Sequence, residues 1–282
     1  MNRLAISVVL FICSSAFVCE AASDCSCELY VLQTLQAEKE NALASAKELP
    51  FTYFEDCQDA FNQGYVKSGV YPIKPPSSAR PFKVWCDMET DGGGWIVIQT
   101  RFDGLEDFYR TWVEYRNGFG SVFSEHWLGL NYIRHITQNG DYELLIEFTG
   151  YRPGEYANAR YSTFMVGSED EKYRLYVGKY SSDYGKIKDA LTTHNGSMFT
   201  TKDSDNDEHT NNCSADMAKG GWWYKKCYGS NLNGVWMSEA KALATEGTQT
   251  TSNVSGLTWR YVFGNLNTFY SLKSVEMKVR RC

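Results

Sequence analysis

The sequence predicts an α+β fold, and three observations favour it. Short runs of aromatic and β-branched residues alternate with turn residues between 51 and 95, which is typical of strands separated by tight turns. A helix is expected around Asn131–Thr137, followed by alternating strand-like runs from Tyr142 to Tyr180. The last run, Tyr270–Arg280, also alternates between apolar and polar residues. We therefore expect strands from both halves of the chain and a few short helices.

Length and composition limit the class of protein. The chain has 282 residues, of which 43% are hydrophobic, so it can form a substantial core as one large domain or two small ones. Its net charge is −6 and it contains no basic run. This balance argues against binding to nucleic acid or to anionic membrane surfaces.

The first 22 residues have the pattern of a secretory signal peptide. Arg3 precedes an apolar run from Leu4 to Val18, and small residues follow it. The run is too short to span a membrane, and it lacks the period expected of an amphipathic core helix. We therefore expect a secreted, extracellular protein without membrane insertion.

Residues 23–50 are expected to form a cysteine-containing helical segment. The stretch Glu28–Leu49 lacks glycine and proline, and leucines recur along it, although Gln36 and Lys39 interrupt a heptad pattern. A helical linker and a short coiled coil are both compatible with this pattern. Seven cysteines remain after removal of the signal peptide, so at least one is free or bonded to another chain. Cys25 and Cys27 favour a disulfide-linked homo-oligomer.

Three alternating aspartates form a candidate cation site. Asp203, Asp205 and Asp207 would repel one another on a buried strand face, whereas a loop around Ca²⁺ needs such oxygen ligands. An EF-hand is not indicated, because Glu208 replaces the glycine at the sixth position and Ser214 the glutamate at the twelfth. The alternative is a solvated acidic turn.

The sequence around these aspartates indicates a family. The aspartate run is followed in order by Asn212-Cys213, Gly221-Trp222-Trp223-Tyr224, Cys227 and Asn231-Leu232-Asn233-Gly234, while Cys86-Asp87-Met88 and Gly92-Gly93-Gly94-Trp95 lie earlier. In these motifs the region 51–282 resembles the fibrinogen C-terminal domain, as found in ficolins, tachylectin-like lectins and invertebrate fibrinogen-related proteins. The resemblance implies a central twisted antiparallel sheet with short helices and a loop-rich, calcium-binding C-terminal part, preceded here by the short helix.

The resemblance also implies specific bonds and ligands. It pairs Cys57 with Cys86 and Cys213 with Cys227, which leaves Cys25, Cys27 and Cys282 as candidates for interchain disulfides. It assigns one Ca²⁺ to the side chains of Asp205 and Asp207 and to the backbone carbonyls of His209 and Asn211.

The resembling lectins imply the main functional hypothesis. It is a calcium-dependent, secreted lectin of innate immunity that binds acetylated glycans on microbes. A cis peptide at Lys226–Cys227 would shape the acetyl pocket, whose implied residues are Tyr224, Lys226, Cys227, Tyr228, Asn253 and Val254. The alternative is an adhesion, matrix or receptor-ligand protein of the fibrinogen or angiopoietin type.

Other motifs carry less weight. The sequence contains no HExxH and no Gly-x-Ser-x-Gly, so an enzyme is not expected. Asn195 and Asn253 lie in sequons and are expected to be glycosylated, whereas Asn212 lies beside the expected disulfide. At least one of Trp222 and Trp223 is expected in the core.

Overall fold

The structure is a computed structural model that describes Gln36 and residues 53–245, 255–263 and 271–282. The chain divides into two compact units, Met1–Thr52 and Tyr53–Cys282. The expected signal peptide at 1–22, the expected helical segment at 23–50 and its Cys25 and Cys27 lie outside the described residues. No helix in the described ranges is long and apolar enough to cross a membrane.

The second unit contains many strands and several short helices. The helices are α3 (Cys57–Asn62), η2 (Thr90–Gly92), α4 (Trp112–Asn117), α5 (Leu130–Thr137), η3 (Thr192–His194), η4 (Ser214–Ala218) and α6 (Glu239–Thr245). The strands are β1 (Gly69–Ile73), β2 (Phe82–Asp87), β3 (Trp95–Arg101), β4 (Phe119–Gly120), β5 (His126–Trp127), β6 (Tyr142–Thr149), β7 (Tyr156–Val166), β8 (Leu175–Ser181), β9 (Ser230–Asn231), β10 (Thr258–Trp259) and β11 (Ser274–Arg281).

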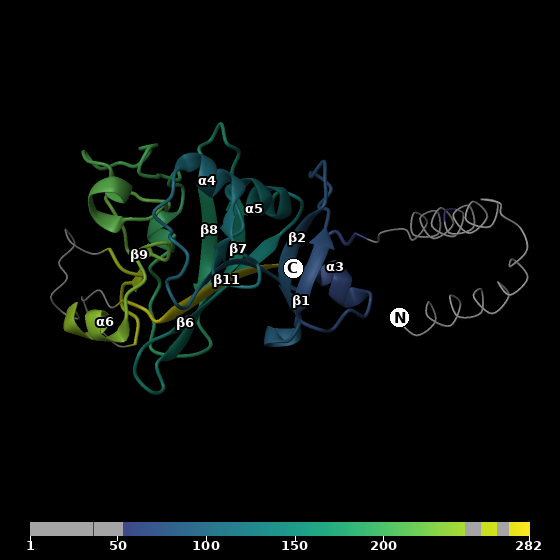
Figure 1. Ribbon diagram of the computed structural model, residues 1–282, viewed down its shortest axis with the longest axis horizontal. Helices are drawn as coiled ribbons and strands as arrows, with labels where there is room; N and C mark the ends of the chain where they lie inside the picture. The colour runs from purple at the N-terminus through teal and green to yellow at the C-terminus, as the bar shows by residue number, and fades with distance from the viewer. Residues whose placement is uncertain (1–35, 37–52, 246–254, 264–270) are drawn as a thin grey trace, which may run out of the picture. The chain divides into compact units, whose positions relative to one another are not determined.

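A nine-stranded sheet forms the centre of this unit. Its main path runs β1-β2-β3-β11-β6-β7-β8, with β4 and β5 attached at β3, and every pair is antiparallel. The last strand along the chain, β11, therefore lies between β3 and β6 in the middle of the sheet (Figure 1). The prediction of an α+β fold with a central antiparallel sheet is confirmed.

Helix α5 covers the sheet at β7 with an apolar face. Its buried residues Leu130, Ile133 and Ile136 recur at the spacing of one helical face. Gly129 precedes the helix with φ of 109°, and a Cβ there would lie 2.8 Å from the backbone of Asn117. The predicted helix around Asn131–Thr137 agrees with α5 to within one residue.

Aromatic side chains form the core beneath the loop-rich C-terminal part. Trp223 contacts Phe199 at a ring-centroid distance of 5.1 Å and Trp222 at 5.2 Å, and both tryptophans are fully buried. The expectation that at least one of them belongs to the core is therefore confirmed. This core fixes the chain on either side of Trp223, where the candidate site is built.

A buried ionic cluster lies in the middle of the sheet. A β-bulge between Met277 and Lys278 interrupts the register of β11 with β3, and Lys278 is buried between two apolar neighbours. Its Nζ lies 2.7 Å from Asp87, 2.7 Å from Glu147 and 2.6 Å from Glu276. Burial raises the pKa of Asp87, but hydrogen bonds from Lys278 and Thr90 outweigh it and hold that pKa at about 2. One cation thus bridges three carboxylates.

Two disulfides connect distant segments. Cys57–Cys86 joins α3 to β2, and Cys213–Cys227 closes the loop that carries η4. Both are the pairs that the family resemblance implied. Cys282 is exposed and forms no disulfide with another cysteine of the described ranges, so its interchain bond stays a prediction.

Candidate functional site

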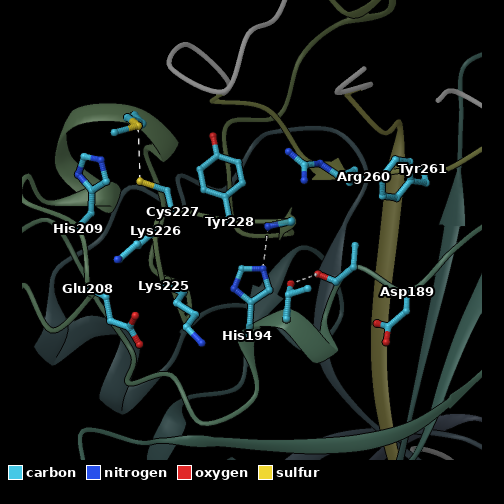
Figure 2. A pocket seen from close by; sticks show the side chains of 14 residues that line it. Asp189, His194, Glu208, His209, Lys225, Lys226, Cys227, Tyr228, Arg260 and Tyr261 are labelled. Atoms are coloured by element: carbon cyan, nitrogen blue, oxygen red, sulfur yellow. Dashed lines mark hydrogen bonds between the residues drawn. The ribbon is translucent and has the colours of Figure 1, made fainter. Parts of the chain in front are cut away.

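A cavity of about 660 Å³ lies beside the second disulfide, at the loop-rich end of the domain (Figure 2). It is lined by residues from five separate stretches of chain, namely Asp189, Ala190, Thr193, His194, Glu208, His209, Met217, Lys225, Lys226, Cys227, Tyr228, Gly229, Arg260 and Tyr261. Its size is suited to a small ligand or to a few residues of a protein partner.

His194 holds the floor of the cavity together. Its Nδ1 lies 2.7 Å from the carbonyl oxygen of Trp223, and its Nε2 accepts N–H groups of Gly229 at 2.9 Å and Ser230 at 3.2 Å. This pattern requires a neutral ring with the proton on Nδ1. Burial lowers the pKa of His194 to about 4, so the neutral form persists well below pH 7. The imidazole fixes the turn that carries Tyr228.

The carboxylate of Asp189 is also engaged within the protein. It accepts the hydroxyl of Tyr161 at 2.7 Å and the backbone N–H groups of Leu191 and Thr192, each at 3.0 Å. Burial opposes its ionisation, but these hydrogen bonds, led by Thr192, hold the pKa of Asp189 below its usual range. The Asp189 carboxylate therefore orders the start of η3.

The rim of the cavity is predominantly basic. Lys225 and Lys226 are exposed, and the Arg260 guanidinium lies 5.8 Å from the ring centroid of Tyr261. In Figure 2 the Arg260 side chain points across the cavity towards Tyr228. Glu208 is the remaining lining carboxylate. The local charge is therefore opposite to the net charge of −6 of the whole chain.

The residues expected to bind an acetyl group separate into three sets. Lys226, Cys227 and Tyr228 line the cavity. Tyr224 does not, because it is buried and its hydroxyl donates to the carbonyl of Gly220 at 2.6 Å. Asn253 and Val254 lie outside the described residues. Figure 2 shows Tyr228 standing in the middle of the lining set.

The expected cis peptide at Lys226–Cys227 is wrong. The described part of the chain contains only trans peptide bonds. A non-proline cis bond is disfavoured by about 3–4 kcal/mol, and the turn at Cys227 is formed without it. The cavity therefore owes its shape to the disulfide and to His194.

The aspartate loop fits a hard cation. Asp207 accepts the backbone N–H groups of His209 at 2.9 Å and Cys213 at 3.0 Å, and its own N–H donates to Asp205 at 3.3 Å. Burial, and then the neighbouring charge of Asp205, raises the pKa of Asp207. Neither carboxylate has a salt bridge to any described side chain. Two adjacent carboxylates supply oxygen ligands of the kind that Ca²⁺ prefers.

Asp203 has a separate role. Its Oδ1 accepts the backbone N–H of Trp112 at 2.8 Å and the hydroxyl of Thr201 at 2.8 Å. It therefore connects the loop to the start of α4 rather than facing Asp205.

Comparison with known proteins identifies the family. The model of the C-terminal globular domain of fibrinogen beta and gamma chains matches residues 53–282. The chain belongs to this fibrinogen C-terminal domain family. The fibrinogen-like globe domain of human ANGPTL2 is 39% identical and superposes with a TM-score of 0.72, covering 81% of this chain and 99% of that one. The lamprey fibrin D-dimer complexed with the peptide Gly-His-Arg-Pro-amide is 28% identical, with a TM-score of 0.69, covering 99% and 92%.

Individual relatives within the family are angiopoietin-related and fibrinogen-like proteins. Angiopoietin-related protein 7 of Bos taurus is 40% identical over 227 residues, which is 80% of this chain and 61% of that protein. Angiopoietin-2 of Sus scrofa is 38% identical over 252 residues, with coverages of 89% and 47%. Fibrinogen-like protein 1 of Rattus norvegicus is 39% identical over 242 residues, with coverages of 81% and 72%. The chain thus spans only about half to three fifths of the length of the two angiopoietin relatives.

The expected function as a lectin for acetylated glycans is wrong. The relatives are angiopoietin-related and fibrinogen-like proteins, which favours the alternative hypothesis. The motifs that this chain shares with the lectins led to the wrong function because their residues stabilise the fold. Asn231 and Asn233 are buried and donate to the carbonyls of Ala218 and Gly221, so the Asn-Leu-Asn-Gly motif identifies the fibrinogen fold and not a ligand.

Sequence reasoning missed much of the cavity. His194 lies 33 residues before Cys227 in the sequence, and Arg260 lies 33 residues after it. No local spacing marks either residue, and the fold alone brings them to one wall. Only the turn at Cys227 was marked by a sequence motif.

The sequons differ in their surroundings. Asn195 is exposed, and its side-chain oxygen accepts the N–H of Val177 at 2.9 Å. Asn212 donates to the carbonyl of Thr201 and accepts from Ala215, so its amide is engaged within the fold. Glycosylation of Asn195 stays a prediction, and Asn253 lies outside the described ranges.

Proposed function

We propose that the chain is an extracellular, non-enzymatic binding protein of the angiopoietin and fibrinogen-like type, which holds an acidic segment of a protein partner in its cavity. The observation that carries this proposal is the basic rim of Lys225, Lys226 and Arg260 around a rigid floor. The angiopoietin-related and fibrinogen-like relatives support the class, and the two disulfides are compatible with an oxidising compartment.

The cavity offers recognition groups rather than catalytic ones. His194 is a buried lining histidine, and hydrogen bonds engage both of its nitrogens. The Asp189 carboxylate is likewise engaged. The lamprey fibrin structure contains a peptide with a cationic arginine. The basic rim of this chain favours the opposite charge in its partner.

Peptide selection on the immobilised domain tests the proposal. A random peptide display library should yield acidic sequences. The double variant Lys225→Glu/Lys226→Glu should bind them about tenfold more weakly or worse, because it converts attraction to repulsion. The control Lys74→Glu/Lys83→Glu reverses two exposed lysines that do not line the cavity and should bind normally. Enrichment of neutral or basic peptides, or equal loss in both variants, would reject the proposed partner class.

Calcium is proposed to order the loop next to this cavity. One Ca²⁺ would be held by the side chains of Asp205 and Asp207 and by the carbonyls of His209 and Asn211, and its role would be structural. Extracellular calcium modules have dissociation constants of about 10⁻⁴–10⁻³ M. About 2 mM Ca²⁺ should therefore stabilise the domain by roughly 0.7–1.8 kcal/mol and raise its Tm by a few degrees.

The variants Asp205→Ala and Asp207→Asn should lose this calcium-dependent shift in a thermal melt. Asp183→Asn removes an exposed carboxylate elsewhere and should keep it. An undiminished calcium shift in both loop variants would contradict the ligand assignment.

A further inference from the structure

Soft ligand atoms surround the second disulfide. His209, Cys213 and Cys227 each offer one ligand atom, and these atoms lie within 4.8 Å of one another. The Sδ of Met217 lies 3.5 Å from the Sγ of Cys227. In Figure 2 His209 stands beside Cys227, on the wall opposite Arg260. Two cysteine sulfurs and an imidazole nitrogen thus lie close together, with a thioether beside one of the sulfurs.

The two disulfides differ in access. Cys227 lines the cavity and is 7% exposed, whereas Cys213, Cys57 and Cys86 are all 0% exposed. A thiol entering the cavity can approach Cys227, because that residue belongs to the wall. The first disulfide has no such approach. Selective opening of Cys213–Cys227 is therefore expected under mild reduction.

We propose that reduction of Cys213–Cys227 by a dithiol creates a binding site for a thiophilic d¹⁰ cation such as Zn²⁺, formed by Cys213, Cys227, His209 and Met217. A thiolate of the dithiol attacks the Cys227 sulfur, and Cys213 leaves as a thiolate. The second thiol of the reductant then resolves the mixed disulfide, releasing Cys227 and a cyclic disulfide. The two thiol protons pass to the cysteines and are released to solvent when the cation binds.

The donor set fits this cation. Zn²⁺ is bound tetrahedrally by cysteine and histidine, and thiolate and thioether sulfurs also favour Cu⁺. A Zn–S distance of about 2.3 Å in a tetrahedron separates two sulfurs by ~3.8 Å. The Met217–Cys227 contact already approaches this separation.

The proposed cation site lies between the aspartate loop and the cavity wall, so its formation would affect binding in the cavity. Cys213 N–H donates to Asp207 of the aspartate loop, His209 lies in that loop, and Cys227 lies in the cavity wall. Opening the disulfide separates the loop from the wall, and the cation reconnects them through different bonds. The proposal goes beyond the proposed partner binding and does not depend on it.

The experiment starts with the full chain in calcium-containing buffer. Mild treatment with dithiothreitol, alkylation and peptide mass mapping should label Cys213 and Cys227 while Cys57 and Cys86 stay bonded. After anaerobic removal of the reductant, Co²⁺ is added as a spectroscopic probe. The reduced protein should show the visible bands of tetrahedral cobalt with a thiolate charge-transfer band, and Zn²⁺ should displace them. The oxidised protein should show neither.

Variants distinguish this site from adventitious thiol binding. His209→Gln should weaken Zn²⁺ binding at least about tenfold, and Met217→Leu, which keeps the volume, should weaken it less. His135→Gln alters a histidine remote from the disulfide and should bind as the reduced parent does. A cobalt spectrum that His209→Gln leaves unchanged, or the absence of tetrahedral bands, overturns the proposal. Loss of the folded circular-dichroism spectrum on reduction also overturns it, because the site requires the folded frame.

Discussion

Acidification from pH 6.5 to 4.5 is expected to destabilise the domain by about 2–3 kcal/mol through His194 alone. The ordinary pKa of histidine is 6.5, and burial lowers that of folded His194 to about 4. Above pH 6.5 the ring is neutral in both states, so the free energy of unfolding is unaffected. Between these values only the unfolded chain binds the proton. Stability is therefore lost as the pH falls towards 4.

Denaturant unfolding at a series of pH values measures this loss, and His194→Gln is the matched variant. Glutamine can donate to Trp223 and accept from Gly229, but it does not titrate. The variant should have a shallower decline of stability between pH 6.5 and 4.5. Both proteins retain His126, His135 and all carboxylates, so the difference between their slopes isolates His194. Equal slopes would show that its protonation is not coupled to folding.

Replacing Lys278 by methionine is expected to reduce stability by about 3–5 kcal/mol. Methionine occupies a similar volume, but it leaves Asp87, Glu147 and Glu276 close together without their cation. In a domain of this size the Tm should fall by roughly 6–20 °C. Scanning calorimetry of the purified protein measures the change.

Two further variants test this interpretation of Lys278. Lys83→Met removes an exposed lysine from β2 and should change stability by less than about 0.5 kcal/mol. Adding Glu276→Gln to Lys278→Met should recover part of the loss, because it removes one uncompensated carboxylate. A Lys278→Met protein that melts within 1–2 °C of the parent would show that the carboxylates protonate or hydrate without penalty.

Local periodicity predicted the elements in which buried residues recur at a regular spacing. Helix α5 follows from apolar residues on one face, and the alternating run expected at Tyr270–Arg280 contains most of β11, which spans Ser274–Arg281. Local periodicity does not predict the order of the strands in the sheet. Nothing in the alternation of β11 indicates that it lies between β3 and β6, and the family resemblance was needed to expect a central sheet.

The candidate site was predictable only where it coincides with a motif. Cys227 and Tyr228 follow a recognisable cysteine spacing, and both line the cavity. Tyr224 belongs to the same motif, yet its hydroxyl is buried against Gly220, because a motif residue can serve the core as readily as a ligand. His194 and Arg260 reach the cavity through tertiary structure alone, so no sequence interval identifies them. The basic charge at the rim of the cavity therefore depends on residues that only the tertiary structure brings together.

The central position of β11 determines when the domain can become complete during synthesis. Until residues 274–281 emerge, β3 and β6 have no partner on their facing sides, and the chain consists of two half-sheets with open edges. Unpaired edges invite pairing with other nascent chains. Closure also requires contacts between residues far apart in sequence, such as Lys278 with Asp87, which slows folding. The unfinished sheet must therefore be protected until almost the whole domain has been synthesised, so the yield of folded protein should depend on the supply of chaperones.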